Sequence, residues 1–139
     1  MNEERFQPLI AAATRARLQS LAPFSRFLVG AAVRTENGKV YIGCNVESAS
    51  YGLTVCAERV AIWKALSEGE RQFTELAVVA DTESLTPPCG TCRQIIWEFC
   101  KNATIVLANL RGATETVSIS DLLPRAFDAR FLKEVTRQE

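Results

Sequence analysis

The sequence predicts an α/β fold, in which helices cover the faces of a β-sheet. Segments with apolar residues at helical spacing alternate along the chain with short apolar runs that suit buried strands. An Asn-Gly pair at 37–38 predicts a hairpin, and helices between the later strands predict parallel pairing by crossover. The chain has 139 residues, 47% hydrophobic and 23% charged, which fits one globular domain over 1–139.

The first half of the chain is expected to form a helix, a hairpin and a second helix. Apolar residues recur at helical spacing over 3–21, and Pro23 ends that pattern. Segments 27–33 and 40–46 are predicted to be strands joined by a turn at 36–38. A helix is predicted over 55–66, ending near Gly69.

The second half is expected to alternate strand and helix. A strand is predicted over 76–80, and a helix over 89–100 follows two prolines, which suit a first helical turn. Strands are predicted over 105–109 and 114–119, and a short C-terminal segment begins at Leu122. The two central helices should begin at neighbouring strand ends, which is where open α/β sheets place their ligands.

The charge balance favours a small ligand over a polyanion. Sixteen basic and sixteen acidic residues cancel, and no block of like charge occurs. Proteins that grip nucleic acid usually carry a basic excess, so no nucleic-acid partner is expected. The apolar runs are too short to cross a bilayer, and the first residues lack the layout of a secretion signal. We therefore expect a cytoplasmic protein with no membrane partner.

The chain has five cysteines and no histidine. An odd number of cysteines without a secretion signal argues against a disulfide scaffold. The lack of histidine removes the usual general base at neutral pH. Acid–base chemistry must then depend on a carboxylate, a thiolate, a lysine or a metal-bound water.

Three of the cysteines have the spacing of a metal site. Cys89 and Cys92 lie three residues apart at a predicted helix start, so their sulfurs share one face, and the helix dipole favours thiolates there. Cys56 lies at the start of the other central helix. Three protein ligands with one open position are typical of a catalytic zinc ion, whereas structural zinc sites usually close with four.

Glu58 is the candidate proton carrier. It lies two residues after Cys56, about 200° around a helix, so it is not expected to bind the same metal but can reach a water on it. Zinc lowers the pKa of its water to about 7, and Glu58 would then move the proton. Three thiolates weaken that effect, and Arg59 is the nearby cation that would offset their charge.

Other interpretations of these residues remain open. The pair Cys89 and Cys92 alone also fits a redox dithiol, and the zinc site could belong to a binding module without catalysis. Arg59 could be a solvated helix residue. Cys44 and Cys100 are expected to be ordinary buried thiols, and Trp63 and Trp97 to be core residues.

These motifs together resemble the cytidine deaminase family. The resemblance rests on Phe27-Leu-Val-Gly-Ala-Ala-Val33, Cys44-Asn-Val-Glu-Ser-Ala-Ser-Tyr51, Cys56-Ala-Glu-Arg59 and Pro88-Cys-Gly-Thr-Cys-Arg-Gln94, in the family's order and spacing. It implies a three-layer α/β/α sandwich with a mixed five-stranded sheet, of the cytidine deaminase kind. It also implies attack of a zinc-activated water on C4 of cytosine, with a glutamate that does not bind the metal.

The resemblance assigns further roles. It implies that Cys56, Cys89 and Cys92 hold Zn²⁺ and that Glu58 moves the protons. It implies that Asn45 and Glu47 bind the sugar hydroxyls, although a glutamate after a strand is more often a solvated edge residue. Substrate contacts are implied for Phe27 (otherwise a core residue), for Ala57, and for Phe127, which would reach a neighbouring subunit's site in a homotetramer.

The sequence departs from the family pattern at three positions. Pro87 and Thr91 replace a usual Ser and Ala in the second cysteine motif, and Ser48 replaces a frequent Asn. Pro87 lies beside the expected base pocket and offers neither a hydroxyl nor an N–H. The expected reaction is deamination of cytidine or deoxycytidine in pyrimidine salvage. The alternative is a related or modified cytosine nucleoside, such as a blasticidin S-like or 5-substituted one.

Overall fold

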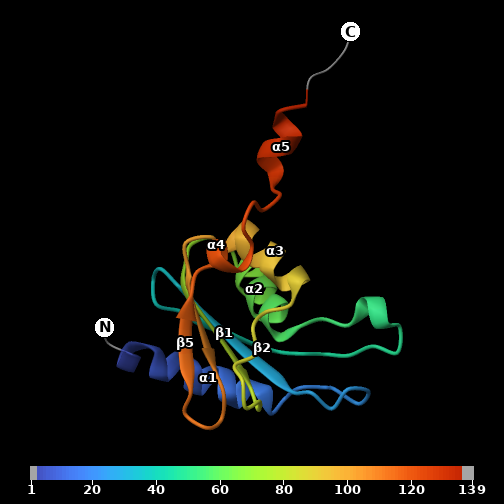
Figure 1. Ribbon diagram of the computed structural model, residues 1–139, viewed down its shortest axis with the longest axis vertical. Helices are drawn as coiled ribbons and strands as arrows, with labels where there is room; N and C mark the ends of the chain where they lie inside the picture. Colours follow the sequence, from blue (N-terminus) through green and yellow to red (C-terminus); the bar gives the residue numbers. More distant parts are fainter. Residues whose placement is uncertain (1–2, 136–139) are drawn as a thin grey trace.

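The computed structural model describes residues 3–135 (Figure 1). These residues contain a five-stranded sheet with the strand order β2-β1-β3-β4-β5. The strands are β1 (Val29–Thr35), β2 (Val40–Cys44), β3 (Phe73–Ala80), β4 (Thr104–Ala108) and β5 (Thr114–Val117).

The sheet is mixed, as the resemblance implied. β1 pairs antiparallel with β2 and β3, β3 pairs parallel with β4, and β4 pairs antiparallel with β5. The parallel pair is the one joined by helix α3 (Gly90–Phe99), which confirms the predicted crossover.

The expectation that both central helices begin at neighbouring strand ends is wrong in one respect. Helix α2 (Ala57–Ser67) follows β2 and helix α3 follows β3, but β1 lies between these two strands. Because β1 is antiparallel to both, β2 and β3 run in the same direction. Their carboxyl ends therefore share one edge of the sheet, and the helix starts meet there in spite of the intervening strand.

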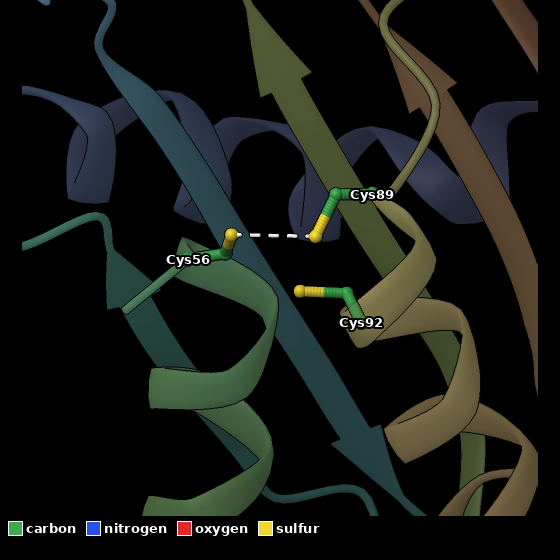
Figure 2. Close-up of side chains that lie close together, drawn as sticks. All are labelled: Cys56, Cys89 and Cys92. Atoms are coloured by element: carbon green, nitrogen blue, oxygen red, sulfur yellow. Dashed lines mark hydrogen bonds between the residues drawn. The ribbon is translucent and has the colours of Figure 1, made fainter. Parts of the chain in front are cut away.

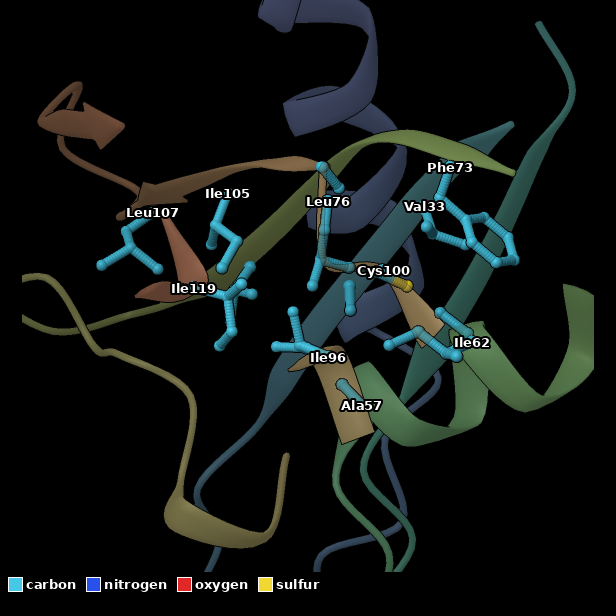
Figure 3. Close-up of a cluster of buried hydrophobic side chains, with 14 of the residues drawn as sticks. Val33, Ala57, Ile62, Phe73, Leu76, Ile96, Cys100, Ile105, Leu107 and Ile119 are labelled. Atoms are coloured by element: carbon cyan, nitrogen blue, oxygen red, sulfur yellow. The ribbon is translucent and has the colours of Figure 1, made fainter. Parts of the chain in front are cut away.

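Helices cover both faces of the sheet, so the three-layer α/β/α sandwich is confirmed. Helix α1 (Gln7–Arg17), preceded by η1 (Glu3–Phe6), packs on one face, and α2 and α3 pack on the other (Figure 1). Successive strand residues alternate between the two layers. Val33 faces the larger cluster under α2 and α3 (Figure 3), as does Ala31, whereas Ala32 belongs to the cluster under α1.

Two glycines allow helices to pack directly on strand backbones. A Cβ at Gly30 would lie 1.9 Å from the carbonyl oxygen of Ala13 in α1. A Cβ at Gly43 would lie 2.5 Å from both the carbonyl oxygen of Ala57 and the amide nitrogen of Ala61. The second contact sets how closely the first turn of α2 approaches β2, and this turn carries candidate functional residues.

Helix and strand boundaries differ from the prediction by a few residues. The first helix ends at Arg17 and not near 21, because the amide of Leu21 donates to the carbonyl of Asn45 at 3.0 Å and Leu21 forms an isolated β-bridge with Val46, two residues beyond β2. Trp63 is 45% exposed on α2, so the prediction of a core residue is wrong there. Trp97 is half-buried and packs against the core.

Three short helices were not predicted: η2 (Tyr51–Leu53), α4 (Ile119–Leu122) and α5 (Ala129–Lys133). Helix α5 extends away from the sandwich (Figure 1). Its base is held by the carboxylate of Asp128, which accepts from Trp97 Nε1 at 2.9 Å, and by Gln94 Nε2, which donates to the carbonyl of Phe127 at 2.8 Å. Within residues 3–135, no helix has the length and apolar character needed to span a membrane.

Candidate active site

The sulfur atoms of Cys56, Cys89 and Cys92 converge at the edge of the sheet where α2 and α3 begin (Figure 2). The three Sγ atoms lie within 4.8 Å of one another, and those of Cys56 and Cys89 are 3.6 Å apart. None of the three forms a disulfide. The structure therefore brings together the three residues whose spacing predicted a metal site.

Helix termini place these sulfurs. Cys56 is the N-cap residue of α2 and Cys89 is the N-cap residue of α3, and neither helix start has a side-chain capping bond. Cys92 lies in the first turn of α3 and is fully buried. The positive ends of two helix dipoles thus point at the cluster, which favours thiolates.

The donor set fits a zinc ion. Tetrahedral zinc with Zn–S bonds of about 2.3 Å places its sulfur ligands about 3.8 Å apart, which is close to the spacing found here. A hydrogen bond from the Cys92 thiol, with help from Arg59, lowers the pKa of Cys56 to about 5. The same bond, with burial and the Glu58 charge, raises the pKa of Cys92. All three sulfurs can be thiolates together only beside a cation, which zinc would provide.

Glu58 lies in the first turn of α2 and is 4% exposed. Burial, with a smaller contribution from the Cys56 thiolate, raises the pKa of this carboxyl to about 7, and Arg59 opposes the shift. A carboxyl with a pKa near neutrality both accepts and donates protons readily. Its place beside the sulfurs, in the wall of the same cavity, fits the predicted proton carrier.

Arg59 faces the sulfur cluster rather than bulk solvent. One of its terminal nitrogens, Nη2, lies 3.7 Å from Cys56 Sγ and donates to the carbonyl of Thr54 at 3.3 Å. Its guanidinium also lies over the ring of Trp63, 5.7 Å from the centroid. The Nε atom is buried without a hydrogen-bond partner among residues 3–135. This placement favours the electrostatic role over a solvated helix residue.

A cavity of about 260 Å³ opens beside the sulfur cluster. Its lining is mainly apolar and includes two carboxylates, an amide and two thiols, a combination suited to a small planar ligand with polar substituents. Of the residues singled out from the sequence, the following line it: Phe27, Asn45, Glu47, Cys56, Ala57, Glu58, Pro87 and Cys89.

Asn45 and Glu47 line this cavity and bond to the loop before β1. The Asn45 amide is 8% exposed, donates to the carbonyl of Phe27 at 2.7 Å and accepts from the amide of Val29 at 2.9 Å. The Glu47 carboxylate accepts from the amides of Phe24 and Ser25 at 2.9 and 3.0 Å. Glu47 is therefore oriented by its surroundings and is not a solvated edge residue.

Phe127 lies away from the cavity of its own chain. It is 56% exposed and stacks on Phe131 with ring centroids 5.8 Å apart. This position leaves its ring free to contact another molecule.

Sequence reasoning missed six residues of the cavity wall: Ser25, Val29, Thr54, Val55, Val78 and Thr86. Strand alternation could have found Val29 and Val78, because they share a face of the sheet with the core residues Ala31 and Val33. No comparable signal marks the loop residues, since their place depends on how distant segments pack.

Three cysteines that can form thiolates lie at one edge of the sheet, beside a buried carboxyl and a cavity. This combination is typical of zinc-dependent hydrolases. Comparison with known proteins makes this specific. The family model described as the cytidine and deoxycytidylate deaminase zinc-binding region matches residues 3–108. The chain belongs to this deaminase family.

Individual relatives support the family. A cytidine deaminase of Sporosarcina psychrophila is 47% identical over 133 residues, which cover 95% of this chain and 98% of that protein. The 1.6 Å crystal structure of cytidine deaminase from Burkholderia pseudomallei superposes with a TM-score of 0.85 at 47% identity, covering 91% of this chain and all of that one. A blasticidin-S deaminase of Bacillus cereus is 32% identical over 104 residues, covering 69% of this chain and 74% of that protein.

Proposed function

We propose that this chain catalyses the hydrolytic deamination of cytidine and deoxycytidine to the uridine products and ammonia. The observation that carries the proposal is the convergence of three cysteine sulfurs, two of which line one small cavity together with Glu58. Cytidine deaminases cover nearly the whole chain in sequence and in structure, which supports this substrate.

Cys56, Cys89 and Cys92 would hold the zinc ion, and Arg59 would offset the negative charge of their sulfurs. When bound, zinc supplies Lewis acidity that lowers the pKa of a coordinated water toward 7. Glu58 takes a proton from the attacking water and delivers protons to the pyrimidine ring and to the leaving amine. Water adds its oxygen at C4, the bond from C4 to the exocyclic amino nitrogen breaks, that nitrogen leaves as ammonia, and a carbonyl remains at C4.

The other cavity residues would bind the nucleoside. Phe27 packs against the pyrimidine ring, Ala57 contacts the base beside the zinc ligands, and Asn45 and Glu47 bind the sugar hydroxyls. A glutamate at the sugar end repels a phosphate group, which favours the free nucleoside over the nucleotide.

The test of this function is Glu58→Gln. We expect turnover to fall by about 10²- to 10⁴-fold, because the amide cannot carry protons, while zinc content and circular dichroism stay unchanged. Glu68→Gln, the same change at an exposed residue beyond the end of α2, is the matched control. A Glu58→Gln variant that keeps its metal and most of its turnover would show that another group moves the protons.

A second candidate substrate is a modified cytosine nucleoside. Pro87 lines the cavity and can offer it no hydrogen-bond donor, so the cavity wall at this point is apolar. An ultraviolet assay with cytidine, deoxycytidine, 5-methylcytidine and adenosine separates the two. A kcat/KM higher for 5-methylcytidine than for cytidine would favour this second candidate.

At the level of the whole protein, we infer one deaminase domain over 1–139 that acts in the cytoplasm in pyrimidine salvage. We also infer a homotetramer, in which Phe127 reaches the site of a neighbouring subunit. The exposed Phe127 and the projecting helix α5 support this arrangement.

A further inference from the structure

The Glu47 carboxylate is held by the loop that precedes β1. Its Oε1 accepts from the backbone amides of Phe24 and Ser25 at 2.9 and 3.0 Å. Its Oε2 accepts from the hydroxyl of Ser25. One residue, Ser25, therefore binds both oxygens of a carboxylate that comes from a segment more than twenty positions further along the chain.

The Ser25 hydroxyl makes a second contact that involves the cavity wall. Its Oγ accepts from the backbone amide of Phe27 at 3.0 Å. The carbonyl of Phe27 in turn accepts from the side chain of Asn45 at 2.7 Å. A series of hydrogen bonds thus connects Glu47 through Ser25 and Phe27 to Asn45. The backbone between Asn45 and Glu47 closes this series into a ring.

These bonds leave Glu47 with little free acceptor capacity. A carboxylate has about four acceptor positions, and the loop fills three of them. Two lie on Oε1 and one on Oε2, so the remaining position is on Oε2, next to the Ser25 hydroxyl. The direction from which a sugar hydroxyl can approach therefore depends on where Ser25 holds that oxygen.

We propose that Ser25 is a positioning residue for sugar recognition. Its hydroxyl orients the Glu47 oxygen that carries the last free acceptor position, and it also accepts from the backbone amide of Phe27, which fixes that oxygen relative to Phe27. This inference rests on the proposed function, in which Glu47 binds a sugar hydroxyl and Phe27 packs against the base. The hydroxyl and amide of Ser25 also lower the pKa of Glu47, which keeps the carboxylate ionised and an acceptor only.

The experiment compares two nucleosides that differ in one hydroxyl, deoxycytidine and 2′,3′-dideoxycytidine, on the zinc-loaded Ser25→Ala variant. We expect the KM for deoxycytidine to rise about 2- to 10-fold, the effect of losing one hydrogen bond, with kcat changed less than about twofold. The KM for dideoxycytidine should stay at the wild-type value, because that substrate lacks the 3′-hydroxyl that Glu47 would bind. Ser25→Thr, which keeps the hydroxyl, should restore the KM for deoxycytidine.

Two controls accompany this comparison. Ser67→Ala removes an exposed hydroxyl that donates to the carbonyl of Lys64 at 2.8 Å, and the KM of this variant should be unchanged for both nucleosides. If Ser25→Ala loses its zinc or its native circular dichroism spectrum, Ser25→Gly takes its place. That variant also removes the hydroxyl and keeps the backbone amides of residues 24 and 25, which donate to Glu47.

The outcomes separate this inference from the function on which it rests. An equal rise in KM for both nucleosides in Ser25→Ala, with Glu47→Gln still impairing deoxycytidine alone, would overturn the role of Ser25 and leave that of Glu47. A Glu47→Gln variant that affects both nucleosides equally would overturn the sugar role of Glu47 and the Ser25 inference with it. A wild-type protein that deaminates neither nucleoside would overturn the proposed function itself.

Discussion

Among single residues, Cys89 offers a direct test of the metal site. It is the exposed member of the three cysteines, so its replacement by serine should disturb packing little. A serine hydroxyl is a poor zinc ligand, so we expect Cys89→Ser to bind less than about half an equivalent of zinc after dialysis, measured by elemental analysis. Cys44→Ser is the control and should keep one equivalent. Full zinc retention in Cys89→Ser would remove this residue from the ligand set.

Cys100 should behave as an unreactive thiol. It is 2% exposed at the end of α3, and burial raises its pKa to about 12. Only the thiolate attacks alkylating reagents, so the folded zinc-bound protein should leave Cys100 unlabelled by iodoacetamide at pH 8, as read by peptide mass spectrometry. The raised pKa also means that this group's stabilising effect is complete below about pH 8.5 and declines as the pH rises toward 12. Rapid labelling without unfolding would contradict this environment for the thiol.

At this scale the sequence predicted the chemistry better than the substrate contacts. The grouping of Cys56, Cys89 and Cys92 follows from two helix starts and a three-residue spacing, both of which are local features. Ser25 could not be found this way, because its role arises only when Glu47 returns to the same loop in the fold. Exposed Trp63 was mistaken for a core residue because helical spacing alone does not show which face is covered.

Among the secondary-structure elements, the contact between β2 and α2 depends on Gly43. A methyl group there would lie 2.5 Å from two backbone atoms of α2, which cannot move as a flexible side chain can. We expect Gly43→Ala to lower the free energy of unfolding by about 1–3 kcal/mol and to displace the first turn of α2, which carries Glu58. The midpoint temperature of thermal unfolding and the turnover rate, measured on the same preparation, should both decrease.

The control for this change is Gly52→Ala. A Cβ at Gly52 meets nothing within 4 Å, so both stability and turnover should remain close to wild type. If Gly43→Ala were as stable and as active as Gly52→Ala, the close approach of α2 to β2 would not be what positions the site.

The order of the main elements was predictable, but their ends were not. Apolar periodicity located α1, the hairpin, α2, β3 and α3. It extended the first helix too far, because residues 18–21 leave the helix in order to pair near Val46. The short helices α4 and α5 did carry a local signal, since Ser118 and Asp128 cap them through their side chains. Helices this short have too few turns to show a periodic pattern.

For the whole molecule, the proposed homotetramer predicts that catalytic sites are shared between subunits. The wild-type protein should sediment at about four times its chain mass of 15.3 kDa. Phe127→Ala should lose most of its turnover while keeping its zinc and its fold, because the ring is exposed in its own chain.

Mixing variants tests this sharing directly. Phe127→Ala and Glu58→Gln should each be nearly inactive, but oligomers reassembled from an equal mixture should recover up to about a quarter of wild-type turnover. In those oligomers some sites combine an intact Glu58 with the intact Phe127 of the partner. If turnover never exceeds the sum of the two variants, Phe127 acts within its own chain or not at all.

The meeting of two helix starts at one sulfur cluster also couples metal affinity to thermodynamic stability. Helix α2 packs on β1 and β2, whereas α3 connects β3 to β4, so a shared ion would add a link between the starts of two helices that follow different strands of the sheet. An ion that binds only the native state adds about 2.7 kcal/mol to its free energy of unfolding at a concentration one hundred times its dissociation constant. A mutation that moves either helix start would therefore weaken zinc binding, and it would also remove part of the stability that zinc adds.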